Sequence, residues 1–258
     1  MVDILLNVNE RSGKGQTVEM TARGFATLGT GSRIPYTFQM KTQSIDISRY
    51  SFDEFVTFLF DRDWPPTTVA KFDPWYYHTE VVYPPDLICG YYVRLFQQPQ
   101  FLLERFSKLQ LEEGFWAIQV DNLDCSASQI IWRPNLPFAA REECVRTMAD
   151  LFRNFFATEA LDSSVQMWWD SLCYDWHCGN RKRERGGEDE QMQDVIFQTL
   201  TAILALDSSI CQKAALHGLG HLHPPRNGKS NCALYRATPN LTKEQLEYAL
   251  AAAKFEVQ

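Results

Sequence analysis

The sequence predicts a mainly α fold, with stacked antiparallel helix pairs in a HEAT-like arrangement and a small β-rich N-terminal part. From residue 51 onwards, apolar residues recur at i+3 and i+4 spacing in successive segments, as on the buried face of a helix. The first 50 residues differ, because they carry five glycines and show strand-like alternation. We therefore expect a β-rich or irregular segment at 1–50 and a helical domain at 51–258.

The elements follow in order from local signals. Strand-like runs lie at 3–8, 16–20 and 36–41. Ser51 and Glu54 have capping-box spacing, so a helix begins there, and the prolines at 65 and 66 end it. The aromatic, proline-bounded stretch 71–85 predicts a long ordered loop. Further helices are expected at 87–96, 100–106, 108–119, 137–157, 162–176, 191–204, from 207 or 208 to 222, and at 242–255.

Composition limits the partners. The 258 residues are 45% hydrophobic, which is enough for a large core, and the formal net charge is −7. An acidic surface disfavours nucleic acid and anionic membranes, because both attract clustered Lys and Arg. The charge favours a basic protein partner, since opposite charge speeds encounter.

The compartment is predicted from what the chain lacks. Its start has no basic region and only a short apolar run, and no apolar stretch approaches the roughly 20 residues of a membrane-spanning helix. Seven scattered cysteines, an odd number, indicate reduced thiols in the core. We expect a soluble, cytoplasmic protein without a cofactor.

A histidine string at residues 217–223 is the main candidate for chemistry. His217 and His221 are four residues apart and share a helix face, as in zinc helices of the H-E-x-x-H type. Gly218 stands where such enzymes carry the catalytic Glu, and no carboxylate at a fixed offset supplies a third ligand. The sequence therefore favours a packing role, with Gly218 and Gly220 allowing close helix contact, and leaves His217 and His221 as weak metal candidates.

Two further patterns are candidates for chemistry or binding. Cys173, His177 and Cys178 form a group that, with Cys211 or His217, contains zinc ligands, but their spacing is not that of a CxxC pair. The charge run 181–190 is basic in its first half and acidic in its second, and is split by two glycines. It predicts a mobile, solvated loop.

Aromatic and acidic clusters are the candidates for partner binding. Trp and Tyr bury large areas at low entropic cost, and adjacent tryptophans on one helix cannot both face one core. One of the pair Trp168 and Trp169 is therefore expected at the surface. Acidic neighbours would supply charge complementarity. The candidate partner-binding residues are Trp75, Tyr76, Tyr77, Asp61, Asp63, Trp168, Trp169, Asp170, Asp175, Glu188, Asp189 and Glu190.

The second half of the chain resembles a family of bacterial HEAT-like helical proteins. The resemblance is carried by 167–170, 193–200 and the end of the chain, and most strongly by the Cys-Gln-x-Ala-Ala-Leu-His-Gly-Leu-Gly-His string at 211–221. Residues 224–239 depart from the pattern, because a proline-rich stretch replaces a short link. The resemblance implies an accessory or immunity partner of a secreted polymorphic toxin.

Together these observations predict an immunity protein that occludes a basic toxin domain made by the same cell, with no catalytic residue. Two alternatives stay open. One is a small hydrolase, with or without a metal ion, centred on His217 and His221. The other is a helical scaffold protein.

Overall fold

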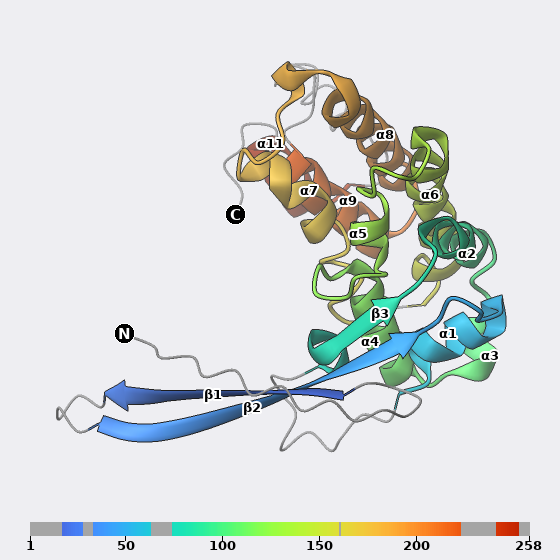
Figure 1. Ribbon diagram of the computed structural model, residues 1–258. Coiled ribbons are helices and arrows are strands. Elements are labelled where there is room, and N and C mark those ends of the chain that lie inside the picture. The colour runs from blue at the N-terminus through green and yellow to red at the C-terminus, as the bar shows by residue number, and fades with distance from the viewer. Residues whose placement is uncertain (1–16, 28–32, 63–73, 160, 223–240, 253–258) are drawn as a thin grey trace.

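The computed structural model describes residues 17–27, 33–62, 74–159, 161–222 and 241–252. Helices dominate these residues, and a three-stranded sheet lies at one end of the helical body (Figure 1). The predicted fold class is confirmed. Within the described residues, no helix has both the length and the apolar character that crossing a membrane requires.

The sheet joins the N-terminal strands to a later segment. Strand β1 (Thr17–Thr27) pairs antiparallel with β2 (Arg33–Asp46), and the end of β2 pairs parallel with β3 (Thr79–Val82). The strand expected at 36–41 is confirmed inside β2, whereas the run 3–8 lies outside the described residues. Strand β3 was missed, because its four residues lie between an aromatic 3₁₀ turn, η1 (Trp75–His78), and two prolines. The predicted loop at 71–85 is therefore corrected in its described part.

Capping boxes start two helices where the sequence predicted them. In α1 (Phe52–Phe60), Glu54 N–H donates to Ser51 Oγ while Ser51 N–H donates to the Glu54 carboxylate. Ser107 and Gln110 make the same reciprocal pair at the start of α4 (Lys108–Gln119). Each box satisfies backbone N–H groups that the helix itself leaves unpaired.

Aromatic side chains fill the core between the first helices. Helix α2 (Pro85–Gln97) carries Tyr92 and Phe96, whose rings stack at 5.6 Å, and Phe96 meets Trp168 edge to face. The short helices α3 (Leu102–Arg105) and α5 (Ala127–Ile130) flank α4 in the chain. Phe115 of α4 meets the rings of Phe155 and Phe156, so the aromatic core extends to the segment about 40 residues further along the chain.

One predicted helix is continuous and another is shorter than expected. Helix α6 (Phe138–Leu151) runs directly into the π-helical turn η2 (Phe152–Phe156), as the prediction of 137–157 requires. The helix predicted at 162–176 forms only as α7 (Asp170–His177), and residues 163–169 are bends and turns. Glu112 accounts for part of the difference, because its carboxylate accepts the backbone N–H groups of 162–164 and competes with helix formation there.

The last helices form the layer that carries the histidine string. Helix α8 (Gly187–Leu204), preceded by the 3₁₀ turn η3 (Arg183–Arg185), packs antiparallel to α9 (Ser209–Leu222). Gln193, near the start of α8, donates to the carbonyl of Leu222 at the end of α9, as antiparallel packing requires. Helix α11 (Lys243–Ala252) packs against α9 and lies inside the predicted 242–255.

Candidate functional site: an Asp–His cluster

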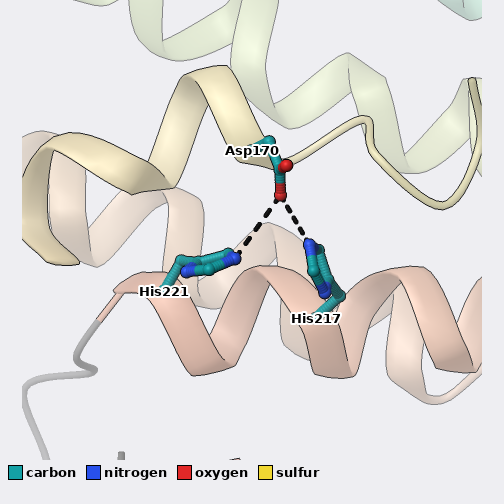
Figure 2. A group of neighbouring side chains, drawn as sticks. All are labelled: Asp170, His217 and His221. Atoms are coloured by element: carbon teal, nitrogen blue, oxygen red, sulfur yellow. Dashed lines mark hydrogen bonds and ion pairs between the residues drawn. The ribbon is translucent and has the colours of Figure 1, made fainter. Parts of the chain in front are cut away.

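Two helices bring together a carboxylate and two imidazoles. The i+4 spacing of His217 and His221 places both on one face of α9, and Asp170 opens α7, which packs on α9. Figure 2 shows both imidazoles pointing at the same carboxylate oxygen. In these three side chains, named here the Asp–His cluster, Asp170 lies 47 residues before His217 in the sequence.

Gly218 permits the close approach of the two helices. A Cβ at this position would lie 2.7 Å from Trp169 Cβ and 2.9 Å from Leu200 Cδ2, closer than packed carbon atoms come. The expectation that Gly218 serves helix packing is confirmed. The packing has a consequence that the sequence did not reveal, because Asp170 follows Trp169 directly and is carried with it to the histidines.

The cluster is compact and partly shielded from water. His217 Nε2 lies 2.5 Å from Asp170 Oδ1, and His221 Nε2 lies 3.5 Å from the same oxygen. The His221 side chain is 9% exposed, against 32% for Asp170. Asp170 also lies in the first turn of α7 and His221 in the last turn of α9, where the helix dipoles favour a negative and a positive charge.

The cluster offers a divalent metal one oxygen and two nitrogen ligands. Its three ligand atoms lie within 4.8 Å of one another. Zinc binds His nitrogen and Asp oxygen at about 2.0–2.2 Å, so tetrahedral ligand atoms are separated by about 3.4 Å. The 3.5 Å distance from His221 to Asp170 fits this spacing. The 2.5 Å distance from His217 Nε2 to Asp170 Oδ1 would have to increase by about 1 Å if a metal bound. The hydrogen bond between these two atoms would then be replaced by a bond from each of them to the metal.

Aromatic rings form one side of the cluster. The ring of His177, at the end of α7, lies 5.1 Å from that of His221 and stacks on Tyr174 at 5.4 Å. Within the described residues, the group of metal-binding geometry contains Asp170, His217 and His221 but not His177 or a cysteine. Burial raises the pKa of the Cys173 thiol, and the Cys211 thiol faces the carbonyl of Phe152. The zinc site considered around Cys173, His177 and Cys178 is therefore not assembled in the described residues.

A cavity of about 430 Å³ adjoins the cluster, and His217 forms part of its wall. Ser209, Lys213 and Leu216 line it from the same face of α9, and Met167 and Glu244 line it from other segments. The site thus combines possible metal ligands with space for a small molecule. Sequence reasoning missed this cavity, since α11 and the 163–169 segment meet α9 only in the folded chain.

The predicted aromatic anchors lie mostly inside the molecule. Trp168 and Trp169 are both buried, so the expectation that one of them reaches the surface is wrong. They occupy the turn before α7 and not a regular helix, which frees their side chains to point into two parts of the core. Trp168 meets Phe96, whereas Trp169 stacks on Phe152 at 6.1 Å.

The other aromatic cluster is only partly accessible. Tyr76 is buried and Trp75 is half-buried, with its ring edge to face against Phe58. Tyr77 is 46% exposed and remains accessible to a partner.

Most of the predicted acidic contacts are engaged within the chain. Arg181 pairs with both Asp175 and Asp189, and Arg183 pairs with Glu190. The Glu188 carboxylate lies 2.6 Å from the buried guanidinium of Arg141. Residues 187–190 therefore form the first turn of α8, which corrects the mobile loop predicted for 181–190.

Three acidic candidates remain. Asp61 accepts a hydrogen bond from Gln110, and Asp63 lies outside the described residues. Asp170, predicted as a partner contact, belongs instead to the Asp–His cluster.

The cysteines agree with the reduced state expected from sequence. Cys89, Cys125, Cys144, Cys173 and Cys211 are free and buried, and Cys178 is free and exposed. Cys232 lies outside the described residues.

No family model, curated protein or solved structure matches the chain, so its function has to be inferred from its own residues.

Proposed function

We propose that this protein is a hydrolase that binds a divalent metal, preferably zinc, through Asp170, His217 and His221. The single observation that carries the proposal is the convergence of these three ligand atoms within 4.8 Å at the wall of a cavity. Three protein ligands with one open position are the usual set of a catalytic zinc site, whereas structural sites have four protein ligands. This choice develops the metal-dependent alternative that the histidine spacing already left open.

The ligands and the cavity have separate tasks. A metal in the cluster supplies an acidified water and polarises a carbonyl group of the substrate. Asp170 contributes the negative charge that the two neutral imidazoles lack. Met167 and Leu216 provide apolar walls that limit the access of bulk water to the substrate.

Glu244 is the candidate proton acceptor. In the histidine string, Gly218 stands where zinc helices carry the general base. Glu244 lines the same cavity as His217 but comes from α11, so the missing carboxylate is available from another helix. In this proposal it takes the proton of the attacking water.

Hydrolysis of a short-chain 4-nitrophenyl ester tests the function. The full chain is assayed after dialysis against EDTA and after zinc is restored. We expect activity to require zinc and to fall by at least about 100-fold in Asp170→Asn. His78→Ala, in η1 and outside the cluster, is the matched control and should retain activity. Equal rates with and without zinc, or in Asp170→Asn, contradict the proposal.

A second candidate is the inhibition of a basic protein, such as the toxin domain that the family resemblance implies. It is supported by the net charge of −7 and by two exposed apolar side chains on consecutive elements, Tyr77 of η1 and Val82 of β3. The test is to express the chain with basic toxin domains from its own cell. Relief of toxicity by the wild type, with an affinity at least about tenfold weaker for Tyr77→Ala, is expected. A chain that protects against none of these toxin domains contradicts this candidate.

A further inference from the structure

The cavity beside the Asp–His cluster has a polarity that indicates its ligand. Ser209, Lys213 and His217 succeed one another at i+4 spacing, so one stripe of α9 runs along its wall and reaches the cluster. Leu216 and Met167 add apolar surface to the lining of the same cavity. A ligand that fills this space therefore meets apolar side chains, the ammonium of Lys213 and, one helical turn further, His217 of the cluster.

Lys213 is the cation of this wall. Its ammonium forms no ion pair within 4.0 Å among the residues that the structure describes, although Glu244 lines the same cavity. Two arginines near the C-terminal layer, Arg181 and Arg183, are by contrast already engaged by carboxylates. Lys213 is thus the basic group that the cavity offers to an incoming anion.

We propose that the cavity binds a small carboxylate whose other end carries an ester or amide, with Lys213 holding the carboxylate. The inference rests on the proposed function, since the ester or amide end must meet the Asp–His cluster. Lys213 and His217 are one helical turn apart, which separates the bases of their side chains by about 5 to 6 Å. A ligand that spans a similar separation has an acyl chain of about four or five bonds.

The reaction on such a half-ester balances with water alone. The oxygen of one water forms a bond to the acyl carbon, and the bond from that carbon to the alcohol oxygen breaks. One proton of the water passes through Glu244 to the departing alcohol. The second proton of the water leaves the new carboxyl group to solvent, so the products are a dicarboxylate, an alcohol and one proton, and no oxidant or further reactant is needed.

Calorimetry with hexanoate and hexanamide tests the role of Lys213 without relying on turnover. The two probes have nearly the same shape and differ in charge. We expect wild-type protein to bind hexanoate about five- to tenfold more tightly than hexanamide, with and without zinc. Lys213→Met should abolish this preference, and Lys213→Arg should retain most of it.

Lys243→Met is the matched control. Lys243 starts α11 and pairs with Glu247, and it does not line the cavity. The preference should therefore survive its replacement. Equal affinity of wild type for both probes, no binding of either, or a preference that survives Lys213→Met overturns the assignment of Lys213.

The same titrations separate this inference from the proposed function. A preference that survives Lys213→Met and disappears with EDTA would assign the carboxylate to the metal, which overturns the lysine assignment and leaves the metal centre standing. A preference that depends on Lys213 in a chain that retains no zinc would support the anion site and contradict the metal-dependent hydrolase.

Discussion

Glu112 shows how much a single carboxylate contributes to this fold. Its oxygens accept three backbone N–H groups at 162–164 and the hydroxyls of Ser163 and Ser164. Burial raises the pKa of this carboxyl, but the hydrogen bonds from Ser164 and Ser163 outweigh it, and the net pKa is lowered. The ionised form therefore stabilises the turn that leads to Trp168.

We predict that Glu112→Gln lowers the free energy of unfolding by about 2 kcal/mol, because an amide cannot accept all of these donors. Because the folded pKa is lowered from 4.5, the contribution is present above that value and is lost as pH falls through the lower folded pKa. Urea unfolding measures the change. The exposed Glu104→Gln is the control, and equal losses in the two variants would contradict the prediction.

The pKa of the neighbouring carboxyl, Glu113, is shifted in the opposite direction. Burial and the charge of Glu112 raise the pKa of Glu113 to about 7. Because the folded pKa is raised, the contribution of the Glu113 carboxyl to stability is fully present below pH 4.5 and is lost as pH rises through about 7. We predict that Glu113→Gln is more stable than wild type by about 1 kcal/mol at about pH 8, after allowance for screening by water, and nearly equal to it at about pH 4. Urea midpoints at the two pH values check this, and a difference that does not change with pH would refute it.

At the scale of elements, the contact of α7 with α9 decides whether the Asp–His cluster exists. A Cβ at Gly218 would overlap Trp169 and Leu200, both fixed in the core. We predict that Gly218→Ala destabilises the fold by about 2 to 3 kcal/mol and moves Asp170 away from the histidines. The midpoint temperature of thermal unfolding and the affinity for zinc should both fall.

Gly90→Ala in α2 is the matched control for that substitution. Nothing lies within 4 Å of a Cβ at Gly90, and alanine favours a helix interior over glycine by roughly 0.5–1 kcal/mol. This variant should be slightly more stable than wild type. A Gly218→Ala protein as stable as Gly90→Ala would show that α7 and α9 do not pack as described.

Elements were predictable from sequence where their signals are local. The capping boxes of Ser51 and Ser107 lie within four residues of the helices they start, and both helices begin as predicted. Strand β3 and the turns at 163–169 depend on partners elsewhere in the chain, β2 and Glu112, and were missed. Asp170 was missed as a metal ligand for the same reason, because a ligand on another helix has no fixed sequence spacing from the histidine pair.

Over the whole molecule, the candidate site depends on long-range packing and not on a motif. The histidine pair was visible in the sequence, whereas its carboxylate and its cavity arise only when α7, α9 and α11 assemble. The tryptophans predicted to bind a partner serve this assembly instead: Trp169 contacts Gly218 and Trp168 fills the aromatic core. The candidate site therefore lies at the Asp–His cluster and its cavity and not at the aromatic residues predicted to bind a partner.

Equilibrium dialysis against zinc tests the central claim most directly. We predict that wild-type protein retains one zinc ion per chain and that Asp170→Asn and His221→Ala each weaken binding by at least about tenfold. His78→Ala should bind zinc as the wild type does. A wild-type chain that retains no zinc, or an Asp170→Asn variant of unchanged affinity, would contradict a metal centre and leave the Asp–His cluster as an ion pair between two helices.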